Sequence, residues 1–227
     1  MADAKQEPEI RTALIVVDMQ EDFLTPNGTL PVPTGRSLIP SINALLAQPF
    51  TLKLATKDWH PADHISFASS HAGATPFSST TTLHNPLNPS EKLTTRLWPT
   101  HCVQNTPGAE LADGLAKERF HGVVNKGERK EVEMYSAFQD AFGQRSGLGD
   151  WLKRERIERV LVVGIAGEYC VLETARDAVR GGWKTGLLED VVGCVDGSRW
   201  GEVKGELERA GVEILKGEEM GKWLGWE

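Results

Sequence analysis

A chain of 227 residues, with 40% hydrophobic and 25% charged residues, has the composition of an ordinary globular protein and is long enough to bury one large core. Its formal net charge of −7 disfavours nucleic acid and anionic membrane surfaces as partners, so we expect a small-molecule substrate. No stretch of the sequence approaches the roughly eighteen consecutive apolar residues that a membrane-spanning helix needs.

Continuous apolar runs, each followed by a stretch with helical periodicity, recur along the chain. Strands are expected at residues 13–17, 51–56, 122–125, 160–163, 184–188 and 212–215, and helices at residues 37–47, 148–156, 170–180 and 199–210. Strands that alternate with helices pair in parallel through right-handed crossovers. The sequence therefore predicts a three-layer α/β/α sandwich with a mainly parallel central sheet, formed as a single domain over residues 1–227.

Two segments do not fit this alternation. Residues 1–11 are mostly polar, and we expect them to form a loose N-terminal tail. Residues 61–107 are rich in Ser, Thr, Pro, Asn and His and are too long for a plain connection. Long excursions of this kind usually serve a site, so we expect residues 61–107 to form a lid or wall beside one.

The cysteines indicate a reducing compartment. Cys102, Cys170 and Cys194 are an odd number without a cysteine-rich framework, and the chain does not open with a charged and then apolar signal segment. We therefore expect a cytoplasmic location, with the nucleus left open, in which a thiol stays free for chemistry.

Reactive side chains follow four of the expected strands. Asp18 follows the first strand, Asp58 and His60 follow the second, Lys126 follows the third, and Cys170 begins the helix after the fourth. Ligands of open α/β sheets bind at the carboxyl ends of the strands. We therefore expect these residues to share one site.

Three of these residues suggest nucleophilic catalysis, although each also has a structural interpretation. Cys170 lies near a helix N-terminus, where backbone amides and the helix dipole lower a thiol pKa and can form an oxyanion hole. Asp18 is a candidate general base for that thiol. The structural alternatives are a small buried hydrophobe for Cys170, a turn or helix-cap residue for Asp18, and a solvated surface lysine for Lys126.

A second group of residues suggests a metal site. Asp58 and His60 are two positions apart and share a face if the segment is extended, and His101 could add a third ligand from the 61–107 excursion. One carboxylate and two imidazoles suit one divalent ion, with Zn favoured over Fe or Mn, and leave positions open for water or substrate. His64 is a further candidate ligand, Cys102 is a minor one, and a polar loop without metal is the structural alternative.

The chain resembles the isochorismatase-like cysteine hydrolases, and within them the nicotinamidase/pyrazinamidase branch. The resemblance runs from about residue 12 to residue 196 and rests on five stretches in the same order: ALIVVDMQEDF, ATKDWHPADHISFASSH, LWPTHCVQNTPGAE, VVNKGERKEVEMYSAF and VVGIAGEYCVLETARDA. It implies a catalytic trio of Asp18, Lys126 and Cys170, and a metal-ligand set of Asp58, His60 and His101.

The resemblance also implies details of the pocket. It places a non-proline cis peptide bond between Ile165 and Ala166, which would aim the amides of Ala166 and Cys170 at an oxyanion. The substrate-binding residues that it implies are Phe23, Trp98, Tyr135 and Ile165.

The implied activity is the hydrolysis of nicotinamide to nicotinate and ammonia through a cysteine thioester, as in NAD salvage, with pyrazinamide as an expected second substrate. No nucleotide cofactor is expected, because Gly164-Ile165-Ala166-Gly167 lacks the G-x-G-x-x-G spacing that holds a pyrophosphate. Self-association into a homo-oligomer is left open. The alternatives are another amide or carbamoyl hydrolase of the same superfamily, an enzyme of the isochorismatase branch proper, and a non-enzymatic nucleotide-binding or regulatory module.

Overall fold

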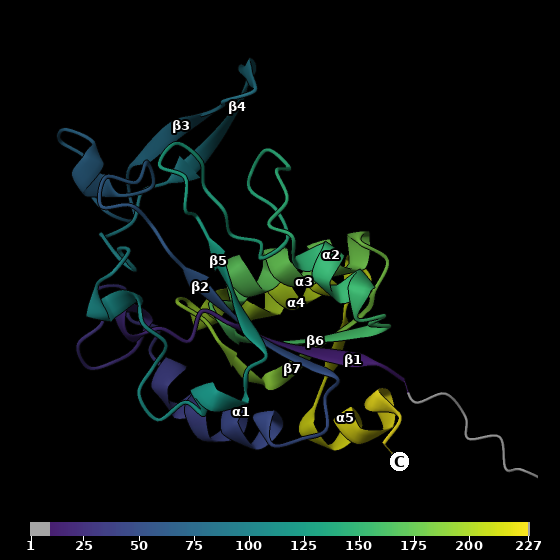
Figure 1. Cartoon of the computed structure of the whole chain (residues 1–227). Helices are drawn as coiled ribbons and strands as arrows, with labels where there is room; N and C mark the ends of the chain where they lie inside the picture. The colour runs from purple at the N-terminus through teal and green to yellow at the C-terminus, as the bar shows by residue number, and fades with distance from the viewer. Residues whose placement is uncertain (1–9, 227) are drawn as a thin grey trace, which may run out of the picture.

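Six strands form one sheet in the order β5–β2–β1–β6–β7–β8 (Figure 1). The computed structural model describes residues 10–226, and every pairing within this sheet is parallel. The bounds of the strands are β1 (Thr12–Val17), β2 (Leu52–Asp58), β5 (Gly122–Lys126), β6 (Arg159–Ile165), β7 (Lys184–Gly193) and β8 (Glu213–Leu215).

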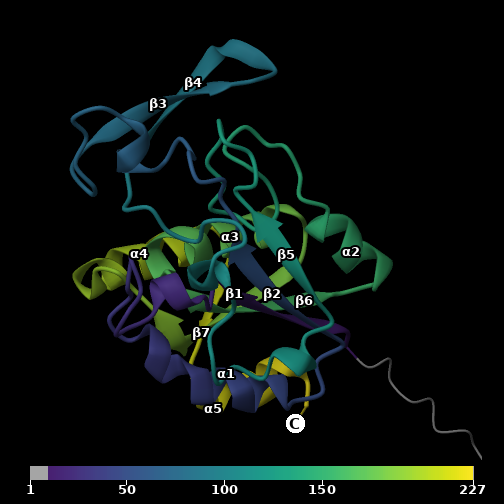
Figure 2. The ribbon, with the colours of Figure 1, turned by 60° about the vertical axis from the view of Figure 1, so that its left-hand side comes forward.

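Helices cover both faces of the sheet, which gives three layers. Figure 1 and Figure 2 show α1 (Ile39–Leu46) and α5 (Gly217–Leu224) on one face. The other face carries α2 (Leu148–Arg154), α3 (Leu172–Arg180) and α4 (Trp200–Arg209). The predicted three-layer α/β/α fold with a parallel central sheet is confirmed.

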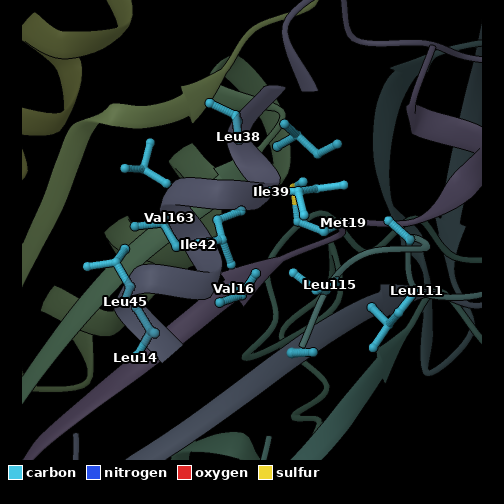
Figure 3. Close-up of a cluster of buried hydrophobic side chains, with 14 of the residues drawn as sticks. Leu14, Val16, Met19, Leu38, Ile39, Ile42, Leu45, Leu111, Leu115 and Val163 are labelled. Atoms are coloured by element: carbon cyan, nitrogen blue, oxygen red, sulfur yellow. The ribbon is translucent and has the colours of Figure 1, made fainter. Parts of the chain in front are cut away.

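The alternation of side chains along β1 explains why its apolar run is continuous. Leu14 and Val16 join the core on the α1 side, where they pack with Ile42 and Leu45 (Figure 3). Ile15 and its alternating neighbours join the second core, beneath α2, α3 and α4. Because successive strand side chains point to opposite faces and both faces are covered, every residue of β1 is buried.

Several elements differ from the sequence prediction. The expected helix at 170–180 begins with a π turn (Gly167–Val171) before α3, and the expected helix at 37–47 opens with a 3-10 turn (Gly35–Leu38) before α1. Helix α5 was not predicted. The 61–107 excursion contains an unpredicted antiparallel hairpin of β3 (Thr80–Asn85) and β4 (Asn88–Arg96), which projects from the body in Figures 1 and 2.

The predicted loose tail lies largely outside the described residues, which begin at residue 10. Within the described part, Arg11 donates a hydrogen bond of 2.7 Å to the carbonyl of Glu155. No helix within residues 10–226 is long and apolar enough to cross a bilayer.

Leu14 and Leu87 provide a matched test of the core. Leu14 is fully buried in β1, whereas Leu87, at the tip of the β3–β4 hairpin, is 85% exposed. Leu14→Ala should lower the free energy of unfolding by about 2–5 kcal/mol, because it leaves a cavity between the sheet and α1. Leu87→Ala should change it by no more than about 0.5 kcal/mol. Urea unfolding followed by circular dichroism measures both, and equal effects would contradict the assignment of the core.

Candidate active site

The carboxyl ends of β1, β2, β5 and β6 bring the predicted reactive residues together. Asp18 directly follows β1 and has a φ of 49°, which lies in the left-handed region. Asp58 ends β2 and Lys126 ends β5, and the register of these two neighbouring strands pairs the two residues directly. Cys170 lies in the π turn that follows β6. The strand exits therefore deliver two carboxylates, an ammonium group and a thiol to one point.

Lys126 is the hub of this cluster. Its Nζ lies 2.8 Å from Asp18 Oδ2, donates to Asp58 Oδ1, and lies 3.2 Å from Cys170 Sγ. Lys126 has no exposed surface, and the other three residues are also buried. Asp18 Oδ1 also accepts a hydrogen bond of 2.6 Å from the hydroxyl of Thr56. A solvated surface lysine, the structural alternative for Lys126, is excluded.

Burial and charge set the protonation of the cluster. Burial alone lowers the pKa of Lys126, but the charges of Asp18 and Asp58 outweigh it and raise that pKa well above its usual value. Burial raises the pKa of Asp58, but Lys126 and His60 outweigh it and lower that pKa strongly. The ammonium of Lys126 and the carboxylate of Asp58 therefore form a stable buried ion pair.

The other two members of the cluster have raised pKa values. Burial raises the pKa of Asp18 despite the opposing charge of Lys126, and burial also raises the pKa of the Cys170 thiol well above its usual value. This outcome differs from the sequence expectation, because desolvation of the thiol outweighs the stabilisation expected from a helix N-terminus. The thiol therefore needs a proton acceptor, and Asp18 is a carboxylate whose raised pKa suits that task.

Asp58, His60 and His101 form a second group that shares Asp58 with the first. The Oδ2 of Asp58 lies 3.6 Å from His60 Nε2 and 3.8 Å from His101 Nε2. His60 Nδ1 lies 2.9 Å from the carbonyl of Gly127, and His101 Nδ1 lies 2.7 Å from that of Pro99. Because a carbonyl only accepts hydrogen bonds, each Nδ1 donates a proton and each Nε2 is left facing Asp58. Metal-ligating histidines are typically oriented in this way.

The charges around these histidines suit a cation. Burial lowers the pKa of His60, but the charge of Asp58 outweighs it and raises that pKa. Burial and the charge of His60 lower the pKa of His101 to about 4, which leaves its imidazole neutral. A divalent ion would take the place of the His60 proton, since histidine must be neutral to ligate metal. The carboxylate and the two imidazoles therefore fit a metal site with further positions open.

Two nearby residues hold Asp58 and His60 in place. The side-chain amide of Gln20 donates to the Asp58 carbonyl at 2.7 Å and accepts from the Asp58 amide at 2.8 Å. Gly127 has a φ of 67°, and a Cβ at this position would collide with the His60 ring. Neither residue was predicted from the sequence as part of the site. Glycine is therefore required at 127 for the carbonyl to approach the His60 ring.

The structure does not bring His64 or Cys102 into the metal-ligand group. The His64 ring stacks on His60 at 4.2 Å, but its Nδ1 bonds to Ser66 at 2.7 Å and its Nε2 to the Val132 carbonyl at 3.1 Å. His64 therefore supports the His60 ring from behind. The Cys102 thiol is buried outside the group found among the described residues.

A cavity adjoins both groups. Asp18, Asp58, His101 and Cys170 line one part of its wall. The rest is largely apolar and aromatic, and includes three of the predicted pocket residues together with five that were not predicted: Phe23, Trp98 and Tyr135, then Leu30, Val32, Glu133, Tyr169 and Val195. The cavity thus combines a thiol with mainly apolar and aromatic walls.

The turn before Cys170 has the predicted backbone. The peptide bond between Ile165 and Ala166 is cis. The Ala166 carbonyl accepts hydrogen bonds from the amides of Tyr169 and Val171. Ala166 lines the cavity, whereas the side chain of Ile165, expected in the pocket, is fully buried in the core on the α1 side. Ile165 therefore reaches the site only through its peptide bond.

The Isochorismatase domain family matches residues 12–219 of this chain. The nicotinamidase of Saccharomyces cerevisiae is 38% identical over 213 residues, which cover 89% of this chain and 98% of the yeast protein. The nicotinamidase of Acinetobacter baylyi is 38% identical over 216 residues, which cover 95% of this chain and 94% of the bacterial protein.

Solved structures show the same relationship. Yeast nicotinamidase bound to the inhibitor nicotinaldehyde superposes with a TM-score of 0.86 at 36% identity, covering 90% of this chain and 99% of that one. PnC1 from L. infantum in complex with nicotinate gives 0.79 at 38% identity, with coverage of 92% and 94%. Pyrazinamidase of Pyrococcus horikoshii in complex with zinc gives 0.71 at 34% identity, with coverage of 92% and 99%. The resemblance drawn from the motifs is confirmed, and this chain belongs to the isochorismatase family.

Proposed function

We propose that this chain is a nicotinamidase, an amidohydrolase that converts nicotinamide to nicotinate and ammonia. The observation that carries the proposal is the position of the Cys170 thiol. It lies on the wall of an aromatic-lined cavity, 3.2 Å from Lys126 Nζ and within 4.8 Å of a carboxylate oxygen of Asp18. The yeast and Acinetobacter relatives named nicotinamidase support the substrate.

The lining of the cavity suits a pyridine carboxamide. Phe23, Trp98, Tyr135 and Tyr169 line it and can contact a flat ring face to face or edge to face. The ligands in the two related structures, nicotinate and nicotinaldehyde, both carry such a ring.

The catalytic steps follow from the cluster around Lys126. Asp18 takes the proton of the Cys170 thiol, and the thiolate attacks the carboxamide carbon. The amides of Ala166 and Cys170 hold the oxyanion. The C–N bond then breaks, Asp18 returns its proton to the departing ammonia, and water hydrolyses the thioester to release nicotinate and restore the thiol. The charge of Lys126 favours both the thiolate and the ionised Asp18.

The metal ligands in this proposal are Asp58, His60 and His101, and the favoured ion is Zn²⁺, with Fe or Mn as alternatives. The zinc in the Pyrococcus pyrazinamidase supports this choice. The chemistry that a bound ion supplies here is orientation of the pyridine ring and withdrawal of electron density from it. Activity on pyrazinamide and a cytoplasmic location remain predictions from the sequence, which leaves homo-oligomer formation open.

Replacing the nucleophile tests the proposal most directly. Purified wild-type protein should release ammonia from nicotinamide, and Cys170→Ala should lower kcat/KM by roughly 10⁴-fold or more, since no other group can form the thioester. Cys194→Ala is the matched control, because Cys194 does not line the cavity, and it should keep at least about a tenth of the activity. Ammonia release by the wild type and by Cys170→Ala at similar rates would contradict the nucleophile assignment.

Replacing a metal ligand tests the second group. His60→Ala should lose both bound metal and turnover, because it removes one of three ligands, whereas Cys170→Ala should keep its metal. His84→Ala is the control, since His84 is exposed on β3. Elemental analysis alongside the ammonia assay measures both properties. A metal-free His60→Ala protein with normal turnover would remove the metal from the proposal.

A further inference from the structure

Both tyrosines on the cavity wall are held by side chains from one short segment at the end of β4. The guanidinium of Arg96 donates to the Tyr169 hydroxyl at 3.2 Å. The indole of Trp98 donates to the Tyr135 hydroxyl at 3.0 Å, and the Thr95 hydroxyl lies 3.4 Å from the same oxygen. The base of the projecting hairpin is thus linked directly to the aromatic wall of the site.

Contacts at its base hold the hairpin in place, and they include backbone hydrogen bonds from Trp98 to Ser66 and from Ala68 to Trp98. Strands β3 and β4 pair with each other and with no other strand among the described residues, and of their side chains only Leu83 and Thr95 are buried. A two-stranded hairpin has little stability of its own. The contacts between its base and the body therefore fix where residues 95–98 lie.

The Arg96 side chain makes two contacts in this region, and both are with aromatic residues. Besides its bond to Tyr169, its guanidinium lies over the Trp98 ring at 5.8 Å. Trp98 in turn meets Tyr169 edge to face, with centroids 4.9 Å apart and an interplanar angle of 88°. Arg96 is exposed, does not line the cavity, and forms no ion pair with any carboxylate within residues 10–226. The planar guanidinium thus braces Tyr169 against Trp98 from outside the cavity.

We propose that Arg96 is a positioning residue, which holds Tyr169 and thereby the aromatic wall beside Cys170 in the orientation that the substrate ring contacts. The proposal rests on the proposed function for its choice of substrate. Tyr169 directly precedes Cys170 and lines the cavity, so a freely turning Tyr169 ring would reshape the wall without removing any reacting group. The loss should therefore appear in substrate binding.

Steady-state kinetics on nicotinamide test this role. Arg96→Met should raise KM about fivefold and change kcat less than about twofold, because the wall loosens while the nucleophile and its neighbours stay in place. Lys92→Met is the matched control, since Lys92 is an exposed cation on the same strand and the change removes the same charge. An equal KM rise in Lys92→Met would show that charge alone is responsible and would overturn the proposal.

A double-mutant cycle with Tyr169→Phe tests whether the effect of Arg96→Met on KM depends on the Tyr169 hydroxyl. If Arg96 acts through the Tyr169 hydroxyl, Arg96→Met should raise KM less than about twofold when Tyr169 is already replaced by Phe. Independent, multiplicative effects would overturn the proposal.

The rate of Cys170 alkylation tests the packing of the same aromatic wall without any substrate. Arg96→Met should increase the rate at which iodoacetamide labels Cys170 about threefold, measured by peptide mass spectrometry, and Lys92→Met should not. A wild-type protein that releases no ammonia would refute the proposed function, while the alkylation rates would still decide the role of Arg96. Unchanged alkylation in Arg96→Met would refute that role even if nicotinamide is the substrate.

Discussion

The buried ammonium of Lys126 is the interaction on which the site depends. It lies among the side chains of Asp18, Asp58 and Cys170, and none of the four is more than 6% exposed. Two carboxylates so close together in a dry environment would repel each other and take up protons unless a cation stood between them. The parallel register of β2 and β5, which pairs Asp58 with Lys126, puts that cation in place.

Asp58 extends the influence of this cation to the histidine pair. One of its oxygens contacts Lys126, and the other faces the Nε2 atoms of His60 and His101. A positive charge between the histidines therefore changes the electrostatic potential at Lys126, and through Lys126 it affects the Cys170 thiol. The two groups are best described as one electrostatic unit with a shared carboxylate, a view that accounts for the opposite pKa shifts of Asp18 and Asp58.

The sequence predicted the sheet and the reactive residues because both follow from buried strands. A strand covered on both faces reads as an unbroken apolar run, and the side chains after such runs meet at one edge of the sheet. The β3–β4 hairpin gave no comparable signal, since most of its side chains face solvent. Tyr169 and Glu133 could both have been found, since Tyr169 directly precedes Cys170 and Glu133 lies in the VVNKGERKEVEMYSAF stretch, two residues before Tyr135. The raised pKa of Cys170 was beyond prediction, because its desolvation comes from segments distant in the sequence.

The separations between these residues have a consequence for folding. The buried bonds that join the site span 38, 68 and 44 residues of chain, from Thr56 to Asp18, from Lys126 to Asp58, and from Lys126 to Cys170. Contacts of such long range form only when the distant strands have paired, and they are slow to form. A partly folded chain would hold these residues apart and carry an ordinary, unactivated cysteine. Turnover would therefore appear only late in refolding, together with the completed sheet, and would report the assembly of the whole domain.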